Sequence, residues 1–328
     1  MKKFSVAVVG ATGMVGRKML DILLERKFPV ERIIPFASKK SAGNMIQFGD
    51  RQFEVVELSL ENIKKFKCAF AFFSAGGSIS KQFAPAFAME DAIIIDNSSA
   101  WRMDTSVPLV VPEVNPHDLK WHKNLIANPN CSTIQSVVAL APLHRKYKIK
   151  RVVYSTYQAV SGAGIAGTND LERGMRGEEP LLFARPIHAN VIPQIDVFLE
   201  TGYTNEEEKM IRETKKILGD ENIQVSATAV RVPVFNGHSV SANVEFEKPI
   251  CIKEIRKILE NAEGVMLFDN PEKNLYPTPL DADGKDDVFV GRVRTDESQD
   301  NTIDMFIVAD NIRKGAALNA VQIAEKLI

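Results

Sequence analysis

Residues 4–20, FSVAVVGATGMVGRKML, determine the fold expected for the first part of the chain. They begin with a near-continuous apolar run, Phe4–Val9, which is typical of a strand buried on both faces of a parallel sheet. Three glycines, Gly10, Gly13 and Gly16, follow at three-residue intervals, and a helical apolar pattern comes after them. A strand, a glycine loop and a helix in this order predict a dinucleotide-binding unit, with the pyrophosphate at the helix N-terminus.

The same alternation of apolar runs and helical patterns continues to residue 130. Strands are expected over 32–37, 66–73, 92–95 and 125–127, with helices over 15–24 and 132–147. We therefore predict an N-terminal, doubly wound, Rossmann-type α/β domain over residues 1–130, completed by a C-terminal helix over 312–328.

The second part of the chain has the pattern of a different sheet. Strands are expected over 152–158, 227–235, 239–245, 288–294 and 302–308, and a helix over Asn205–Leu218 that ends at Gly219. Asn236-Gly237 predicts a hairpin between the second and third of these strands. Alternating apolar residues over 240–246 indicate a strand with one wet face. We predict an α+β domain with a mainly antiparallel sheet over residues 131–311.

The composition excludes several classes of protein. The 328 residues include 41 Lys and Arg against 42 Asp and Glu, which argues against a strongly basic nucleic-acid binder. Three cysteines without a CxxC pair and five histidines without HExxH spacing indicate neither a disulfide scaffold nor a metal site. Glycines interrupt the first apolar run, and no run reaches about 18 residues, so we expect neither a leader nor a membrane span. The expectation is a cytoplasmic protein with reduced thiols.

The end of the second predicted strand bears on the choice of dinucleotide. NAD enzymes usually carry Asp or Glu there, which holds the ribose 2′-hydroxyl. This chain has Ser38-Lys39-Lys40-Ser41 instead, and its cations and hydroxyls suit a 2′-phosphate, although ordinary solvated loop charges are the alternative. We predict NADP, and the predicted contacts are Gly10, Thr12, Gly13, Met14, Val15, Ser38, Lys40 and Ser41.

Cys131 is the candidate nucleophile. In Asn128-Pro-Asn-Cys-Ser-Thr133 it falls at or just before the start of a predicted helix. Unpaired N–H groups at a helix N-terminus favour thiolate over thiol. Cys68, in a phenylalanine-rich run, and Cys251 are expected to be packed, and a buried structural thiol is also the alternative for Cys131.

A nucleophilic cysteine needs a base, and a charge within an apolar strand needs a partner. His238 follows the Asn-Gly turn, where a side chain can project into a cleft, although a structural histidine is the alternative. Arg231 lies within an apolar strand, and Arg102 follows a buried strand near the expected carboxyl edge of the first sheet. Glu213 and Lys216 lie three residues apart on a helix, where an ordinary surface ion pair is the alternative.

Together these residues resemble the aspartate-semialdehyde dehydrogenase family almost from end to end. The resemblance rests on the glycine loop 10–16, the cysteine block 128–133, Gln158 with 161–164, the segments 185–194 and 213–216, and the seven-residue step from Arg231 to His238. It implies a phosphorylating, NADP-dependent aldehyde dehydrogenase that reduces aspartyl-4-phosphate through a cysteine thioester. The reaction belongs to the synthesis of lysine by way of diaminopimelate, and of methionine, threonine and isoleucine.

The resemblance also implies a role for each matching residue. Cys131 attacks the acyl phosphate, and His238 is the general acid/base. Gln158 orients the acyl group and Asn130 helps to position the reacting end. Arg231 holds the substrate carboxylate with its two-pronged set of donors.

Further implied contacts match the remaining charges of the substrate. Glu213 meets the ammonium group, while Arg102 and Lys216 bind the phosphate. The implied cofactor contacts in the rest of the chain are Ser161, Gly162 and Asn319. The family forms homodimers, in some members pairs of dimers, and the long segment 161–195 is expected to act as a lid or subunit contact.

Two alternatives stay open at this point. The same chemistry fits an N-acetyl-γ-glutamyl-phosphate reductase-like or glyceraldehyde-3-phosphate dehydrogenase-like enzyme, whose substrates carry no free ammonium, so Glu213 is the discriminating residue. A non-catalytic nucleotide-binding protein has the fold without the reaction. The intact set of Cys131, Gln158, Arg231 and His238 argues against the second alternative.

Overall fold

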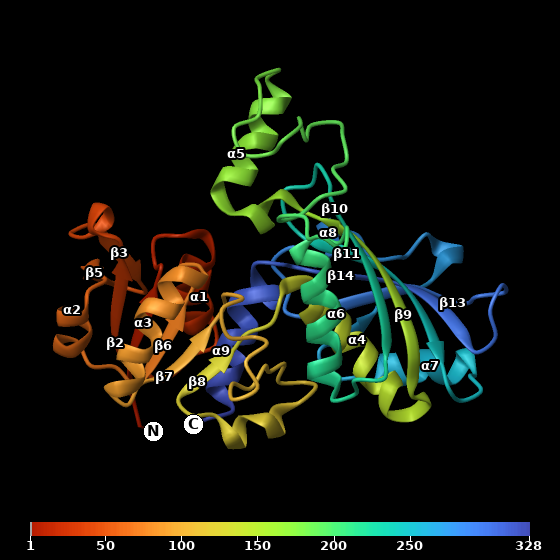
Figure 1. Ribbon diagram of the computed structural model, residues 1–328, viewed down its shortest axis with the longest axis horizontal. Coiled ribbons are helices and arrows are strands. Elements are labelled where there is room, and N and C mark those ends of the chain that lie inside the picture. The colour runs from red at the N-terminus through yellow and green to blue at the C-terminus, as the bar shows by residue number, and fades with distance from the viewer. Residues whose placement is uncertain (1) are drawn as a thin grey trace. The chain divides into compact units, whose positions relative to one another are not determined.

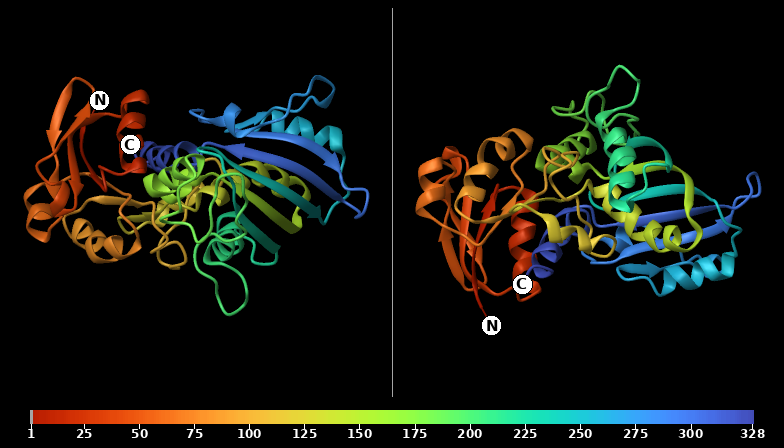
Figure 2. Two further views of the ribbon diagram at one scale, coloured as in Figure 1. Left: turned by 90° about the horizontal axis from the view of Figure 1, so that it is seen from above. Right: turned by 60° about the horizontal axis from the view of Figure 1, so that its bottom comes forward.

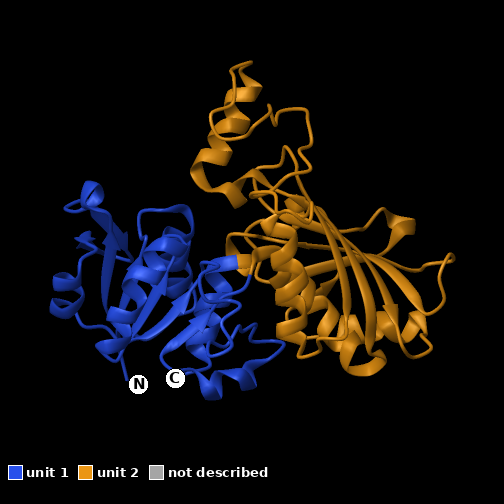
Figure 3. Cartoon of the chain, in the orientation of Figure 1, with its two compact units in different colours: residues 1–129, 316–328 blue, residues 130–315 orange. Residues whose placement is uncertain are grey.

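A computed structural model describes residues 2–328, which divide into two compact units (Figure 3). Unit 1 contains the residues up to Pro129 together with Ala316–Ile328, and unit 2 is Asn130–Gly315. Within residues 2–328, no helix is both long and apolar enough to cross a membrane.

Unit 1 is built on a six-stranded parallel sheet (Figure 1). The strand order is β5-β2-β1-β6-β7-β8, so the chain winds outward from β1 in both directions. The strands are β1 (Phe4–Val9), β2 (Val30–Ala37), β5 (Val56–Glu57), β6 (Phe70–Phe73), β7 (Ile93–Asp96) and β8 (Leu125–Ala127). The predicted doubly wound α/β fold is confirmed, although the strand expected over 66–73 begins only at Phe70.

Helices cover both faces of this sheet. They are α1 (Met14–Glu25), α2 (Leu60–Lys65), α3 (Gly77–Met89) and α9 (Leu318–Glu325). Met19 of α1 and Val321 of α9 belong to one apolar cluster, and Ile63 of α2 and Phe87 of α3 belong to the other. Successive residues of β1 join the two clusters alternately, which explains why nearly all of them are apolar. Helix α9 thus contributes to the core of unit 1, although it follows unit 2 in the chain.

The carboxyl ends of the parallel strands meet along one edge of the sheet. Gly10 follows β1, Ser38 follows β2, Ser74 follows β6 and Asn128 follows β8. The strand order reverses between β1 and β6, and open α/β sheets bind ligands at such a reversal. The smaller elements of unit 1 are the antiparallel pair β3 (Met45–Phe48) and β4 (Arg51–Glu54) and the 3₁₀ turns η1 (Lys39–Ser41) and η2 (Pro116–Trp121).

Unit 2 is built on a second six-stranded sheet of order β10-β9-β11-β14-β13-β12. The three inner pairs are antiparallel and the two outer pairs are parallel, which confirms the predicted mainly antiparallel sheet. The strands are β9 (Ile149–Gln158), β10 (Gln224–Arg231), β11 (His238–Phe246), β12 (Val265–Leu267), β13 (Val288–Thr295) and β14 (Thr302–Ala309).

The main helices of unit 2 lie on one face of this sheet. Helix α4 (Cys131–Tyr147) packs against β9, β11, β13 and β14 and contacts both α6 (Asn205–Leu218) and α7 (Ile252–Glu260). Figure 2 shows the long, twisted strands beside these helices from two further directions. Helix α6 has the predicted bounds, because a capping box at Thr204 starts it and a left-handed Gly219 ends it. Along β11, buried residues alternate with half-exposed ones, so the opposite face is only partly covered.

The predicted hairpin at Asn236-Gly237 is wrong. In the described part of the chain β10 and β11 do not pair, because β9 lies between them, parallel to β10 and antiparallel to β11. Strand β10 stops at Arg231, earlier than expected, and the chain then crosses the end of β9, where Val160 N donates to Val234 O. The Asn-Gly pair therefore ends a crossover rather than a two-residue hairpin.

The glycine-rich segment after β9 forms a small lobe, residues 160–203. It contains the 3₁₀ turn η3 (Val160–Ala163) and the helix α5 (Gly164–Met175). Val160, Leu171, Ile187 and Ile192 form its own apolar cluster. The remaining short elements of the chain are η4 (Pro271–Lys273), α8 (Pro279–Ala282) and the π-helical turn η5 (Arg313–Ala317).

Candidate active site

The glycine loop 10–16 of unit 1 has no space for side chains at two of its positions. Gly10 has a φ of +86°, and a Cβ there would lie 2.4 Å from the carbonyl oxygen of Ser74. A Cβ on Gly16 would lie 2.2 Å from the carbonyl oxygen of Gly10, so only glycine lets α1 approach β1 this closely. This backbone cradle has the form that close approach of a pyrophosphate requires.

The N-terminus of α1 is suited to an anion. Gly13 is its N-cap, no side chain caps the helix, and its first turn contains no acidic residue. Thr12, Met14 and Val15 are half-buried beside this end. The first N–H groups of a helix have no partner within it and carry partial positive charge. The residues present therefore fit a dinucleotide phosphate.

The predicted 2′-phosphate contacts lie at the end of β2. Ser38, Lys39 and Lys40 are exposed, and Ser41 is half-buried at the end of η1. This edge is where related folds bind the ribose of the nucleotide. The ammonium groups of Lys39 and Lys40 suit a ribose that carries a 2′-phosphate better than one with a free 2′-hydroxyl.

Asn128 connects three segments of unit 1. Its Nδ2 donates to Asn97 Oδ1 at 2.6 Å and to Ala316 O at 3.1 Å, and its Oδ1 accepts from Asn319 Nδ2 at 2.7 Å. Buried Arg102 donates from Nε to Asn128 O and from Nη2 to Asn97 O, both at 2.9 Å. Arg102 and Asn319 thus both hold the segment that leads into the cysteine block.

Cys131 is the first residue of α4. The N-cap is Asn130, whose Oδ1 accepts from Ser132 N at 2.9 Å and from Thr133 N at 3.2 Å. A Cβ on Gly315 would lie 2.9 Å from Cys131 Cβ, so the small residue leaves space for the cysteine. Cys131 is half-buried at the positive end of the helix, which favours its thiolate.

A carboxylate that the sequence analysis did not single out lies at this site. Glu206, in the first turn of α6, is buried, and its Oε1 accepts from Asn130 Nδ2 at 2.8 Å and Gln158 Nε2 at 3.2 Å. Its Oε2 accepts from Lys209 Nζ at 3.1 Å. Burial raises the pKa of Glu206, but the charge of Lys209 and the bonds from both amides outweigh burial, so the pKa is lowered overall. Glu206 therefore stays ionised beside the two amide side chains.

Glu213, the carboxylate that the resemblance singles out, lies seven residues further along α6. Its Oε2 accepts from the backbone N of Asn130 at 2.6 Å. Seven residues are about two turns of an α-helix, so Glu206 and Glu213 lie on one face. Glu206 contacts the side chains of the site, whereas Glu213 supports the backbone in front of the cysteine.

Lys209 and Lys216, two of the three lysines on α6, differ in the same way as Glu206 and Glu213. Lys209 Nζ donates to Asp196 Oδ2 at 2.8 Å as well as to Glu206. Lys216, the predicted phosphate ligand, is half-buried two turns further along the helix. The structure therefore brings Lys209 next to the buried carboxylate of the site.

Arg231 is the last residue of β10 and is almost fully buried. Its Nη1 donates to Ala159 O at 2.7 Å, whereas its Nε has no hydrogen-bond partner among residues 2–328. Burial lowers the pKa of Arg231, and the charges of Glu206 and Cys131 oppose that shift, which places both groups within electrostatic range. A buried guanidinium with an unused donor is suited to binding a carboxylate.

His238, the first residue of β11, is fully buried. Ala159 N donates to its Nδ1 at 3.0 Å. The neutral imidazole therefore carries its proton on Nε2, which has no partner among the described residues. Burial, and secondarily the charge of Arg231, holds the pKa of His238 well below its usual value. His238 thus offers a neutral N–H donor at physiological pH.

The side chains of Arg231 and His238 both lie close to Gly162. A Cβ on Gly162 would lie 2.8 Å from Arg231 Nη1 and 3.0 Å from His238 Nε2. The hydroxyl of the adjacent Ser161 accepts from Asn311 Nδ2 at 3.0 Å. Of these two predicted cofactor contacts, Gly162 therefore borders the arginine and the histidine of unit 2, and Ser161 precedes it in the chain.

The other two cysteines lie in different environments. Cys68 is buried, as expected, and burial raises its pKa to about 12. The expectation that Cys251 is packed is wrong, because it is exposed as the N-cap of α7, where the chain turns before the helix. Among the three, Cys131 combines partial burial of the residue with the nearby charge of Arg231.

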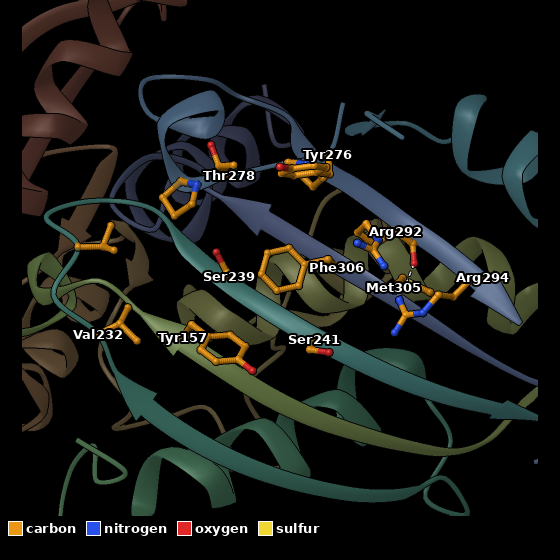
Figure 4. A pocket seen from close by; sticks show the side chains of 13 residues that line it. Tyr157, Val232, Ser239, Ser241, Tyr276, Thr278, Arg292, Arg294, Met305 and Phe306 are labelled. Carbon is orange, nitrogen blue, oxygen red and sulfur yellow. Dashed lines mark hydrogen bonds between the residues drawn. The ribbon is translucent and has the colours of Figure 1, made fainter. Parts of the chain in front are cut away.

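A hollow lies on the other, partly covered face of the sheet of unit 2. This open-face hollow has a volume of about 580 Å³, and its lining includes Tyr157, Ser239, Tyr276 and Phe306 (Figure 4). Tyr157 and Tyr276 are 41% and 43% exposed. Exposed aromatic residues gathered in one hollow are typical of a contact surface for another protein.

Two family models match most of the chain. The model described as semialdehyde dehydrogenase, NAD binding domain, matches residues 5–122. The model described as semialdehyde dehydrogenase, dimerisation domain, matches residues 140–314. The two matches fall in unit 1 and unit 2, respectively.

Similar proteins match over nearly their full length. The aspartate-semialdehyde dehydrogenase of Aquifex aeolicus (strain VF5) is 54% identical over 99% of this chain and 98% of its own. The one from Bacillus subtilis (strain 168) is 47% identical over 98% of this chain and 96% of its own. The structure of aspartate semialdehyde dehydrogenase II from Vibrio cholerae complexed with ASA has a TM-score of 0.95 at 44% identity, covering 100% of this chain and 98% of its own. Aspartate semialdehyde dehydrogenase with NADP from Candida albicans has a TM-score of 0.80 at 25% identity, covering 99% and 98%.

Proposed function

The chain belongs to the aspartate-semialdehyde dehydrogenase family, and on this basis we propose that it reduces L-aspartyl-4-phosphate to L-aspartate 4-semialdehyde with NADPH. In the opposite direction it oxidises the aldehyde and forms the acyl phosphate. The observation that carries the proposal is the buried group of Gln158, Glu206, Arg231 and His238 near Cys131 in unit 2. Unit 1 holds the dinucleotide, and unit 2 supplies the catalytic side chains and the subunit contact.

The charges of the site match the amino-acid part of this substrate. Arg231 binds the α-carboxylate, because its Nε is buried and unused. Glu206 binds the ammonium group. This assignment replaces Glu213, because the carboxylate of Glu206 contacts the side-chain amides of Asn130 and Gln158, whereas that of Glu213 accepts from the backbone N of Asn130. N-acetylated and hydroxylated substrates offer no ammonium to such a buried carboxylate, which favours the aspartyl substrate.

In the first step the Cys131 thiolate attacks the acyl carbon, the bond from that carbon to the phosphate oxygen breaks, and inorganic phosphate leaves. Gln158 orients the acyl oxygen. Lys209, in place of Lys216, binds the departing phosphate, the group for which the resemblance also implies Arg102. The product of this step is a thioester on Cys131.

In the second step the thioester carbon is reduced. NADPH, when bound, supplies the hydride for this reduction. The Nε2–H of His238 donates a hydrogen bond to the resulting alkoxide, which then re-forms a carbonyl as the C–S bond breaks and Cys131 regains its thiolate. Removal of the thiol proton by His238 requires the other tautomer, which the N–H of Ala159 opposes, so α4 and Arg231 stabilise the thiolate instead.

The test is phosphate-dependent reduction of NADP with aspartate semialdehyde, alongside N-acetylglutamate semialdehyde and glyceraldehyde 3-phosphate. We expect turnover with the first aldehyde alone. A comparable kcat/KM for another aldehyde contradicts the assigned substrate. Absence of turnover with all three, together with slow alkylation of Cys131 in a Cys251→Ser background, indicates a nucleotide-binding protein without the reaction.

The preference for NADP over NAD is part of the proposal. It is supported by the exposed cations after β2, and NADP is the dinucleotide in the Candida albicans structure. Lys40→Ala should raise the KM for NADPH about 10-fold, because one charge-assisted contact to the 2′-phosphate is lost, and leave the KM for NADH unchanged. Lys64→Ala, at an exposed position of α2, is the control. Equal kcat/KM values for NADPH and NADH in the unmodified chain contradict this preference.

We also propose a homodimer formed through the open-face hollow. The proposal is supported by the dimerisation-domain match and by the exposed aromatic residues of that face. Sedimentation should give twice the 36.4 kDa chain mass, and a value of four times indicates a pair of dimers. Tyr157→Glu should shift the protein to monomers, whereas Met45→Glu, at an exposed position of unit 1, should not. A Tyr157→Glu protein that remains dimeric places the interface elsewhere.

The proposed compartment is the cytoplasm. Cys131 reacts as a free thiolate, and a reducing compartment keeps it in that form. Fractionation of cells that produce the chain should recover it with cytoplasmic marker proteins, and recovery with membranes or secreted proteins contradicts this location.

A further inference from the structure

Asp170 anchors a backbone segment of the lobe. It lies on α5 and is 3% exposed, and its carboxylate accepts hydrogen bonds from the backbone N–H groups of Leu181 (2.8 Å), Leu182 (2.8 Å) and Phe183 (2.9 Å). Burial raises the pKa of Asp170, but these three bonds outweigh burial and lower it overall. Charge-assisted bonds to three successive residues fix the segment to α5.

Phe183 links this segment to the candidate active site. Its side chain packs on the apolar cluster of the lobe. Its ring also lies 5.9 Å from the Cζ atom of Arg231, within the range of a cation–π contact. The backbone of Arg231 exchanges two hydrogen bonds with Ile192, at 2.8 and 3.0 Å. The lobe therefore holds the arginine from two sides, by its backbone and by its guanidinium.

The lobe and Arg231 also line one cavity. Its volume is about 280 Å³, and its lining includes Leu182, Phe183, Gln194 and Arg231. The unused Nε of Arg231 is a buried donor of the kind that a bound ligand satisfies. An arginine side chain has several flexible torsions, so its use as a carboxylate clamp requires a neighbour that fixes the guanidinium plane.

We propose that Asp170 is a positioning residue for substrate binding, which acts through Phe183 to orient the guanidinium of Arg231 toward the substrate carboxylate. This inference rests on the proposed function, because it assumes that Arg231 binds the substrate. Asp170 itself contacts the backbone of the segment 181–183, so its proposed effect on the substrate is transmitted through that segment.

The test compares Asp170→Asn, Phe183→Leu and the double variant. Each single variant should raise the KM for aspartate semialdehyde about 5- to 10-fold, with kcat and the KM for NADP within twofold, because one cation–π contact is lost. The double variant should show little further increase, since both changes break the same connection. Asp296→Asn, which removes a carboxylate that caps Ser298 N in the same unit, and Phe198→Leu, at a residue 58% exposed in the lobe, are the controls.

A second measurement does not depend on turnover. The rate at which phenylglyoxal labels Arg231, followed by mass spectrometry, should rise several-fold in both variants, because the ring no longer covers the guanidinium. Unchanged labelling, or a double variant whose KM increase is the product of the two single increases, overturns the inference. If Asp170→Asn does not fold, Phe183→Leu still tests the contact with Arg231. An unmodified chain without turnover, but with accelerated labelling in the variants, refutes the proposed function and leaves the connection between Asp170 and Arg231 intact.

Discussion

The two ligand-binding regions of the molecule are built in different ways. In unit 1, the glycine loop 10–16 binds through backbone N–H groups, and its glycines leave no side chain in the way of a ligand. In unit 2, the side chains near Cys131 come from α4, β9, α6, β10 and β11, between positions 131 and 238. A backbone site is therefore encoded in one short stretch of sequence, whereas a side-chain site depends on the topology that brings distant elements together.

Replacing Cys131 should give the largest effect, because it removes the one atom that forms the covalent intermediate. Cys131→Ala should reduce phosphate-dependent turnover by about 10⁴-fold or more. Dinucleotide binding, measured by fluorescence titration, should remain, because the glycine loop belongs to unit 1. Cys251→Ser is the control, and it should keep full activity. Substantial phosphate-dependent turnover in Cys131→Ala excludes this residue as the nucleophile.

Two glycine substitutions compare the two regions directly. Gly162→Ala should lower kcat/KM for aspartate semialdehyde about 10²-fold, because the added Cβ displaces Arg231 and His238. Gly10→Ala should instead lower the melting temperature and the dinucleotide affinity, because its Cβ meets the backbone of Ser74 at a positive φ. Steady-state kinetics and thermal melts separate the two outcomes. An equal loss of dinucleotide affinity in both variants contradicts the assignment of dinucleotide binding to the glycine loop of unit 1.

Glu206 and Glu213, two of the four carboxylates of α6, provide a finer comparison within unit 2. Glu206→Gln should lower kcat/KM for the semialdehyde roughly 30-fold, because a neutral amide cannot pair with the substrate ammonium. Glu213→Gln should have a much smaller effect on kinetics, since an amide oxygen can still accept from Asn130 N. The reverse order of the two effects restores Glu213 as the ammonium ligand.

The smallest expected effect is on the pH dependence of stability. His238 stays neutral in the folded chain, while in the unfolded chain it binds a proton below about pH 6.5. The unfolded state therefore binds more protons there, and folding stability falls as the pH falls. His238→Gln should lose less stability than the unmodified chain between pH 7.5 and 5.5 in urea titrations. Burial also lowers the pKa of His144, so part of the dependence of stability on pH remains in His238→Gln. An identical dependence on pH in both proteins contradicts a buried neutral His238.

Local sequence was sufficient for several elements. The apolar run before Gly10 forms β1 with the expected bounds, and Gly219 ends α6 at the expected residue. Local sequence was not sufficient where a distant strand determines which strands pair. Asn236-Gly237 has the sequence of a hairpin, but β9 occupies the position beside β10 that the hairpin would need.

The same limit applies to the site. Cys131 and the first turn of α4 follow from the local sequence, because the N-cap pattern is local. Glu206 and Glu213 share a helix face, and only the tertiary placement of Gln158 shows which carboxylate meets the site. Acidic residues in the first turn of a helix ordinarily reflect the helix dipole. For this reason the sequence of α6 does not distinguish Glu206, which belongs to the site, from its acidic neighbours.

The position of α9 has a consequence for how the protein is made. Leu318 and Val321 belong to the apolar cluster that also contains residues of α1, yet they leave the ribosome only after all of unit 2. At about 5–20 residues per second, the interval between Pro129 and Ala316 takes roughly 10–40 s of translation. During that time the part of this cluster on which α9 packs is uncovered, although α1 has already been made, so a chaperone that binds it would act before α9 leaves the ribosome.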